Sequence, residues 1–271
     1  MNKSALLVAW GDSRFCLRGR RREELLKSQG FDVRWLCESN GHAETARFTL
    51  VSRSNALSSQ LHSFLLLLTR SYSKYFDKFQ VDEELIQEFG VVIRYDLILV
   101  PLVKKIVKYK AFEADIREFY PRQFEDSIVW RVTFGRLFDR LMSTELQGLD
   151  RTVTVSPGLV EELRVAYNIS AVLLPSYSAF IGPPRKARSM SRSLVHHGVA
   201  NSNRNIDAYF DMMEYLPTTY TLDLFLVKTD NRYFKRIKRK ARKNTRVRLF
   251  EGHAYEDIIS KLPSYDVGIF A

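Results

Sequence analysis

The feature that most constrains the fold of this chain is a regular alternation of short apolar runs with segments of helical spacing. The first run, "SALLVAW" at 4–10, ends at Gly11-Asp12, a helical segment then ends at Gly30, and a second apolar run follows at 31–39. Parallel strands need a long crossover connection, usually a helix, to reach their neighbours. This βαβ opening therefore predicts an α/β fold with a parallel sheet covered on both faces.

The alternation continues to the end of the chain. The patterns predict a helical region at 53–89, further helices at 101–109, 123–147, 157–167, 204–215, 231–243 and 254–262, and strands at 94–100, near 111–115, and at 151–156, 193–199, 220–227, 246–252 and 266–271. A stretch rich in proline, serine and basic residues interrupts them. We therefore expect a Rossmann-like domain at 1–178, a linker at 179–192 and a second, partial Rossmann-like domain at 193–271.

The chain stops at the last expected strand of the second domain, and no further element is expected to cover the far side of that strand. The sequence therefore predicts a C-terminally truncated chain that ends inside its second domain.

Charge and composition narrow the class of partner. The chain has 42 Lys and Arg against 31 Asp and Glu, a net charge of +11, which favours nucleic acid, a phosphate-bearing small molecule or an acidic membrane surface. Cys16 and Cys37 are too few for a disulfide framework or a zinc cluster, which fits a reducing cytosol. The most apolar stretch, at 61–69, is much shorter than the roughly 20 residues that cross a bilayer.

Several stretches carry a resemblance to a known family. "LDRTVTVSPGLVEELRVAYNI", "LVHHGVANSNRNIDAYFDMMEYLP" and "RLFEGHAYEDIISKLPSYDVGIF", in this order, resemble glycosyltransferase family 4 and its relatives. "DIREFYPRQFEDSIVWR" is similar to the acceptor-side domain of bacterial members that build capsule or other cell-surface polysaccharide. The resemblance implies the GT-B architecture, in which two Rossmann-like domains face a cleft, the first on the acceptor side and the second holding a nucleotide sugar.

The same resemblance implies an activity. It predicts a hexosyl-type glycosyltransferase that moves a sugar from a nucleoside-diphosphate sugar to a cell-surface polysaccharide or glycolipid acceptor, with retention of anomeric configuration. It implies no cofactor and no protein-bound metal. It also implies a cytoplasmic protein, with a peripheral position on the inner face of the membrane left open.

The chain departs from the family pattern in three places. The basic residue that normally follows the donor-site glycine is Val199 here, and the later lysine corresponds to Arg204. The strand expected at 94–100 passes straight into "PLVKK", where the family has a loop with a polar pair. The family's glutamate-rich motif would lie beyond Ala271. A second hypothesis is therefore an inactive, truncated remnant of such an enzyme.

The candidate donor site lies where the strand at 193–199 turns toward a helix. Such a turn offers backbone N–H groups and a positive helix end to a diphosphate. Gly198 permits close approach of the backbone, and Asn203 and Arg204 add a donor and a charge. Gly252 and His253, after a later strand, complete the predicted donor-binding set. The alternative is an ordinary strand-to-helix turn.

The adjacent His196 and His197 are poor candidates for a metal site. Successive side chains on a strand point to opposite faces of the sheet, and no suitably spaced cysteine or acidic ligand accompanies them. We therefore predict no metal.

Acceptor and catalytic candidates belong to the first domain. Asp115 and Glu118 follow a short strand, where a carboxylate can orient or deprotonate an acceptor hydroxyl, or instead pair with an arginine such as Arg122. Arg117, together with Gly11 and Asp12 at the end of the first strand, is assigned to the acceptor side of the cleft. Turn chemistry is the alternative for Gly11 and Asp12.

The densely basic segment 231–248 permits several interpretations. Phe234, Ile237 and Ala241 recur at helical spacing and are expected to dock on a sheet, which leaves a basic face in solvent, on anionic lipid or on nucleic acid. The run "RGRRR" at 18–22 repeats this choice. A basic nucleic-acid-binding module is the third, least favoured hypothesis for the whole chain.

Overall fold

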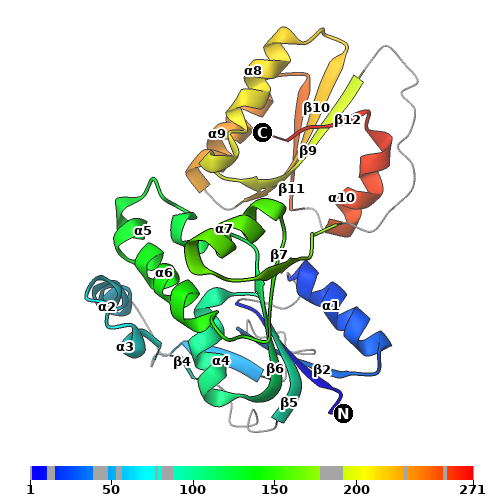
Figure 1. The fold of residues 1–271 in the computed structure, drawn as a ribbon. Coiled ribbons are helices and arrows are strands. Elements are labelled where there is room, and N and C mark those ends of the chain that lie inside the picture. Colours follow the sequence, from blue (N-terminus) through cyan, green and yellow to red (C-terminus); the bar gives the residue numbers. More distant parts are fainter. Residues whose placement is uncertain are drawn as a thin grey trace. The chain divides into compact units, whose positions relative to one another are not determined.

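The computed structural model describes residues 2–10, 16–38, 48–52, 57–76, 79–80, 88–177, 192–228, 231–252 and 255–270. The chain divides into two compact units, Met1–Ser178 and Ala179–Ala271, and each is described by itself. Figure 1 shows the strands and helices of both units.

The first unit is built on one eight-stranded sheet. Its strands are β1 (Ser4–Val8), β2 (Asp32–Glu38), β3 (Phe48–Ser52), β4 (Phe79–Gln80), β5 (Glu88–Arg94), β6 (Lys108–Ile116), β7 (Arg151–Thr154) and β8 (Ala171–Leu173). The spatial order is β4-β3-β2-β1-β5-β6-β7-β8. Pairing is parallel throughout except between β3 and β4. The direction of strand addition reverses between β1 and β5, as in doubly wound folds.

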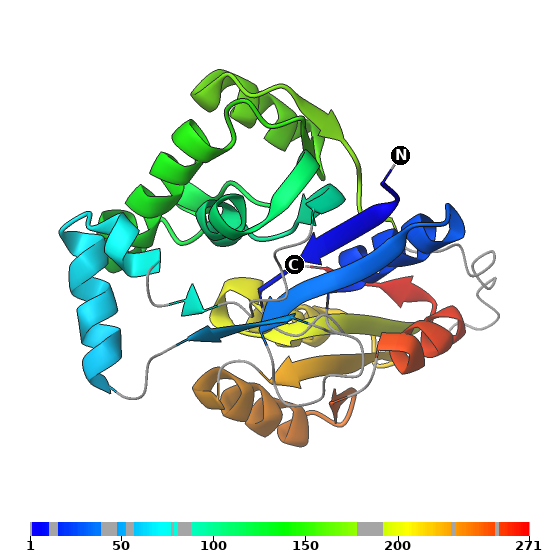
Figure 2. The same cartoon turned by 90° about the horizontal axis from the view of Figure 1, so that it is seen from below.

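Helices cover both faces of this sheet. They are α1 (Leu17–Ser28), α2 (Leu57–Leu68), α3 (Tyr72–Phe76), α4 (Val100–Ile106), α5 (Ile128–Val132), α6 (Phe134–Glu145) and α7 (Pro157–Tyr167), with short 3-10 turns η3 (Leu97–Leu99) and η4 (Tyr120–Arg122). On the α1 face, Leu7, Trp35 and Tyr95 form a buried cluster. A larger cluster lies under α4, α6 and α7. Figure 2 shows α2 and α3 at the rim of the unit.

Local sequence explains several boundaries. Gly30 has φ 79°, a conformation that glycine adopts without strain, directly after α1. Ser156 caps α7, since its hydroxyl accepts a hydrogen bond from the Leu159 amide, and Pro157 takes the first helical position. The predicted ends of these two helices are confirmed.

The predicted strand at 94–100 is wrong, and so is the helical interpretation at 79–80 and 88–89. The β-branched run Val91–Val92–Ile93 lies in β5, which ends at Arg94, and η3 and α4 follow. Pro101 has no N–H to donate, so it fits the first turn of α4, and Lys104 and Lys105 lie in its last turn, as the helix dipole favours. The remaining residues of 81–87 lie outside the described chain.

The second unit has a smaller, wholly parallel sheet. Its strands are β9 (Arg192–Ala200), β10 (Tyr220–Lys228), β11 (Val247–Glu251) and β12 (Val267–Gly268), in the spatial order β11-β10-β9-β12. The helical elements are η5 (Ser202–Arg204), α8 (Asp207–Tyr215), α9 (Asn231–Lys243), α10 (Tyr255–Lys261) and η6 (Leu262–Ser264). Helices α8 and α9 cover one face and α10 the other (Figure 1).

This sheet begins at β9, adds β10 and β11 on one side, and then adds β12 on the other. The first unit grows in the same way from β1. Both units are therefore Rossmann-like, and the predicted α/β fold class is confirmed.

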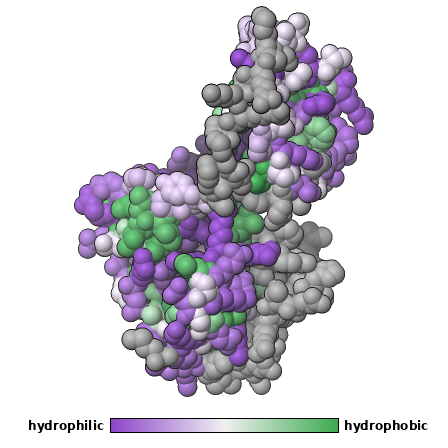
Figure 3. Space-filling view, turned by 90° about the vertical axis from the view of Figure 1, so that its right-hand side faces the viewer, coloured by the Kyte–Doolittle hydropathy of each residue, from purple (hydrophilic) through white to green (hydrophobic). Residues whose placement is uncertain are grey.

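Helix α9 docks as its pattern predicts. Phe234, Ile237 and Ala241 are buried with Tyr233 in the core of the second unit. Asp207 pairs with Arg236 and Lys240, and Glu251 pairs with Lys238, so nearby acids neutralise part of the basic face. On the face drawn in Figure 3, hydrophilic residues cover much of the described surface. Among the described helices, none has the length and apolar character needed to cross a bilayer.

Candidate functional site

The two sheets define where to look for a site. In open parallel sheets, ligands bind outside the carboxyl ends of the strands, at the point where the strand order reverses. That point lies between β1 and β5 in the first unit and between β9 and β12 in the second. Each of these places holds a buried polar side chain with unsatisfied hydrogen-bonding atoms.

His196 is that side chain in the second unit. It lies on β9, is 3% exposed, and its Nδ1 is 3.0 Å from the Ile269 carbonyl and 3.1 Å from the Tyr209 hydroxyl. Its Nε2 has no hydrogen-bond partner. Burial lowers the pKa of His196, and the nearby His197 and Arg204 act in the same direction. The imidazole is therefore neutral at pH 7, and one of its ring nitrogens is buried without a hydrogen-bond partner.

His196 and His197 do not act as a pair. His196 packs beside Tyr209 of α8, whereas His197 is exposed. Within the described part of the chain, no cluster of histidine, cysteine and acidic side chains has the arrangement of a metal site.

Gly198 lies inside β9, opposite Leu226 of β10, because the strand continues to Ala200. The predicted strand at 193–199 also contained Gly198, and the observed strand continues one residue further. A Cβ at Gly198 would meet the His196 Nε2 at 3.5 Å, which is ordinary contact, so packing alone does not require glycine. A side chain there would instead cover the unsatisfied Nε2.

The turn itself begins at Asn201. The Asn201 Oδ1 is buried and has no hydrogen-bond partner. Arg204, at the end of η5, is exposed and places its guanidinium 5.6 Å from the centre of the Phe270 ring. The aromatic ring orients this positive charge beside the carboxyl end of β9.

The helix end contributes less than expected. The first turn of α8 holds Asp207, whose carboxylate is 2.6 Å from Arg236 and 2.7 Å from Lys240. Because an acidic group already occupies this helix N-terminus, Arg204 is the better placed partner for a diphosphate.

Other predicted donor residues are placed only in part. Asn203 belongs to η5, and its side chain lies outside the described set. Gly252 follows β11 with φ 66°, which glycine permits without strain. His253 lies outside the described residues, so its assignment stays a prediction.

Arg94 has the largest number of unsatisfied atoms among the buried side chains described in the first unit, where single atoms of Arg22, Tyr95, Asp115 and Trp130 also lack a hydrogen-bond partner. It is the last residue of β5, is 0% exposed, and none of its three side-chain nitrogens has a hydrogen-bond partner. Burial lowers the pKa of Arg94 to about 10, while Tyr120, Asp96 and Asp115 raise it. The group therefore stays charged at pH 7 in an environment that does not satisfy it.

Asp96 and Arg117 lie beside Arg94 at the same edge of the sheet. One Asp96 oxygen accepts a hydrogen bond from the Trp10 amide at 2.6 Å, and the other is 3.3 Å from the Arg117 guanidinium. Arg117 also donates to the Tyr95 carbonyl at 3.2 Å. Asp96 therefore provides a polar side chain directly after β5. The expectation that the chain has no polar loop after this strand is wrong, because the strand ends at Arg94 and not at residue 100.

The two predicted catalytic carboxylates have different surroundings. Asp115 is fully buried on β6, and its Oδ2 is 2.5 Å from the Arg18 Nε, not paired with Arg122. Glu118 is exposed. Gly11 and Asp12 lie outside the described residues, so their assignment to an acceptor cleft stays a prediction.

Arginines of the basic run at 18–22 form hydrogen bonds and ion pairs within the first unit. Arg18 also donates to the Leu174 carbonyl at 2.7 Å and to the Ser176 hydroxyl at 2.9 Å, and Arg22 pairs with Glu113. The interpretation of this run as a free basic surface is therefore wrong for these two arginines.

Sequence reasoning missed Arg94 and Asp96. The signal was present, since "RYD" interrupts a continuous apolar stretch. These residues were missed because the predicted strand at 94–100 contained both of them, whereas β5 ends at Arg94.

Two doubly wound α/β units in one chain agree with the GT-B class of fold. Among solved structures, the chain is similar to the lipopolysaccharide outer core galactosyltransferase WaaB, with TM-score 0.53 and 13% identity over 97% of this chain and 72% of that one. It is also similar to the catalytic domain of starch synthase IV from Arabidopsis thaliana bound to ADP and acarbose, with TM-score 0.57 and 8% identity over 98% and 77%.

A third similar structure is UGT89C1 from Arabidopsis thaliana complexed with UDP-L-rhamnose, with TM-score 0.53 and 10% identity over 99% of this chain and 74% of that one. At these identities the likeness concerns the fold. No protein-family model matches the chain. No curated protein matches it either.

Proposed function

We propose that this protein is a glycosyltransferase that moves a hexose from a nucleoside-diphosphate sugar to a cell-surface polysaccharide or glycolipid acceptor, with retention of configuration. The observation that carries the proposal is the corner after β9. There Arg204 is held against Phe270, next to the buried, unsatisfied Nε2 of His196, at the reversal of the strand order. The similar structures solved with ADP or UDP-L-rhamnose bound add support at the level of the fold.

The chemistry assigned to this corner is electrostatic. When the bond between sugar and diphosphate breaks, negative charge develops on the diphosphate, and a pre-oriented guanidinium stabilises it. Arg204 supplies this charge. The Ile269 carbonyl, 3.0 Å from the His196 Nδ1, can only accept a hydrogen bond, so Nδ1 carries the proton of the neutral imidazole. The His196 Nε2 is then an acceptor, and in the proposal it accepts a hydrogen bond from a hydroxyl of the ligand.

The first unit is assigned the acceptor. Asp96 and Arg117 form a polar edge beside β5, and Glu118 is the exposed carboxylate next to it. In the proposed reaction Glu118 orients the acceptor hydroxyl. Asp115, held by Arg18, positions the end of β6. Such transfer needs no covalent protein nucleophile, and the proposal includes no metal step.

A calorimetric titration with UDP, ADP and GDP tests the donor site. We expect one of these nucleotides to bind, and Arg204→Ala to weaken its binding by about tenfold to a hundredfold, because a hydrogen bond to a charged group contributes about 1.5–3 kcal/mol. Arg239→Ala, which removes an exposed arginine of α9, is the matched control and should leave the affinity unchanged.

Two results would count against this assignment. If no nucleoside diphosphate binds, the donor function is refuted. If both arginine variants weaken binding equally, the effect is one of overall charge and the corner after β9 is not the site.

A further inference from the structure

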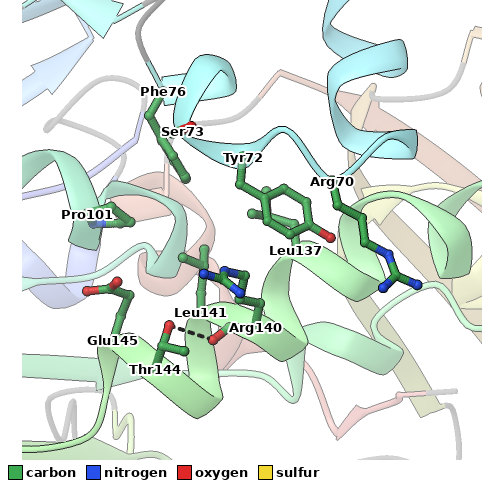
Figure 4. A pocket seen from close by; sticks show the side chains of 10 residues that line it. All are labelled: Arg70, Tyr72, Ser73, Phe76, Pro101, Leu137, Arg140, Leu141, Thr144 and Glu145. Atoms are coloured by element: carbon green, nitrogen blue, oxygen red, sulfur yellow. Dashed lines mark hydrogen bonds between the residues drawn. The ribbon is translucent and has the colours of Figure 1, made fainter.

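The first unit contains a cavity away from the strand ends. Its volume is about 390 Å³, within the range typical of small-molecule sites, and it lies between α3, α4 and α6 (Figure 4). Arg94, Asp96, Arg117 and Glu118 are not among its lining residues. It is therefore separate from the proposed acceptor edge.

One part of the cavity wall is apolar. Phe76 and Pro101 line one side, and Leu137 and Leu141 of α6 are buried behind it. The neighbouring helix α2 leaves Phe64, Leu65 and Leu68 between 36% and 46% exposed. The neighbouring helix therefore also exposes apolar side chains, although none of these three lines the cavity.

Another part of the wall is positively charged. Arg140 places its guanidinium 6.0 Å from the centre of the Tyr72 ring, and Arg70 lies at the end of α2. In the part of the chain that the structure describes, neither arginine forms an ion pair with a carboxylate. The one acidic lining residue, Glu145, is 3.2 Å from the Lys104 ammonium, so its charge is already compensated.

The backbone at Arg70 is unusual. It has φ 59° at the C-terminal cap of α2, where its amide and that of Ser71 bond back to the Leu67 and Leu66 carbonyls. Glycine is the residue that normally takes this left-handed position without strain. Here the position carries a long cationic side chain at the rim of the cavity.

We propose that this cavity binds an anionic amphiphile, a molecule with a phosphate head and a hydrocarbon chain. The phosphate lies against Arg140 and Arg70, and the chain runs along Phe76 and Leu141. The assignment rests on charge complementarity at one end and apolar lining at the other. It goes beyond the proposed glycosyltransferase activity and does not depend on it.

Calorimetry with dodecyl phosphate, below the concentration at which it forms micelles, tests the proposal. We expect saturable binding that Arg140→Gln weakens by about tenfold or more, as loss of a charged hydrogen bond predicts. The matched control is Arg136→Gln on the same helix, which changes an exposed arginine outside the cavity and should not alter the affinity.

Two further ligands separate the head from the chain. Inorganic phosphate should bind at least about tenfold more weakly than dodecyl phosphate, because it lacks the apolar chain. Dodecyl maltoside, which has the same chain and no charge, should also bind more weakly. Equal binding of dodecyl phosphate and either of these ligands would overturn the proposal, as would equal effects of the two arginine substitutions.

Nucleotide binding by Arg140→Gln provides an independent check. We expect it to match the unsubstituted protein, because the cavity and the corner after β9 belong to different units. Loss of nucleotide binding together with loss of dodecyl phosphate binding would indicate general damage and would overturn a local role for Arg140.

Discussion

Replacing Arg94 by methionine should stabilise the protein. Its guanidinium is 0% exposed and unpartnered, and burial lowers its pKa well below the ordinary value of arginine, to about 10. Since one pKa unit corresponds to about 1.4 kcal/mol, the charged group destabilises the folded state by about 3 kcal/mol. This cost is fully present below pH 10 and disappears as the pH rises from there toward the ordinary pKa of arginine, because the unfolded chain then binds more protons than the folded one.

Methionine has a similar reach and no charge, so we expect Arg94→Met to raise the free energy of unfolding by up to about 3 kcal/mol at neutral pH. Urea unfolding followed by tryptophan fluorescence measures this change. All three tryptophans, Trp10, Trp35 and Trp130, belong to the first unit, so the signal reports on the unit that contains Arg94.

Arg18→Met is the matched control and should have the opposite sign. Arg18 is the partner of the fully buried Asp115, and its removal leaves an uncompensated carboxylate, which costs about 3–5 kcal/mol. If Arg94→Met destabilises the unit as Arg18→Met does, Arg94 is a satisfied structural residue and the reasoning is refuted. If Arg94→Met stabilises the unit instead, Arg94 lowers the stability of the fold, as residues that serve a function often do.

Two further predictions concern single side chains. Burial holds the pKa of His196 below its ordinary 6.5, so the unfolded chain takes up this proton first as the pH falls. The stability that neutral His196 contributes is therefore lost below about pH 6.5. We expect the melting temperature to fall less between pH 7.5 and 5 in the His196→Asn variant than in the unsubstituted protein. An equal fall in both proteins would contradict this prediction. Ser156→Ala should lower the free energy of unfolding by about 1 kcal/mol, because it removes the cap of α7. Ser143→Ala, at an exposed position, is the control. Equal effects of the two substitutions would refute a stabilising role for the Ser156 cap.

Elements with a strong local pattern could be predicted from the sequence. Helix α9 has the predicted bounds, 231–243, because its apolar residues recur at helical spacing within an otherwise basic segment. The strand β9 and the cap at Ser156 are similar cases. In each of them the local preference and the tertiary packing agree.

The region around β5 could not be placed in the same way. Residues 91–103 are almost continuously apolar, and such a run is compatible with a buried strand or a buried helix. The structure resolves this choice through sheet pairing with β1 and β6, which are distant in sequence. Because the strand was misplaced, Arg94 and Asp96 were not recognised at its carboxyl end.

For the candidate site in the second unit, the sequence indicated the strand and the turn, and the role of the residues there stays a prediction. Arg204 does lie at the end of β9, but its contact with Phe270 comes from a residue far along the chain. The unsatisfied Nε2 of His196 likewise depends on packing against Tyr209 and Ile269. Burial and hydrogen bonding of this kind are tertiary properties that a local pattern does not contain.

Hydrogen–deuterium exchange in the presence of saturating UDP, ADP or GDP tests the central claim most directly. The account predicts that one nucleotide slows exchange in peptides that cover 196–208, while peptides that cover α9 are unaffected. Protection confined to other segments, or no protection with any of the three nucleotides, would contradict the assignment of the corner after β9 as a nucleoside-diphosphate site.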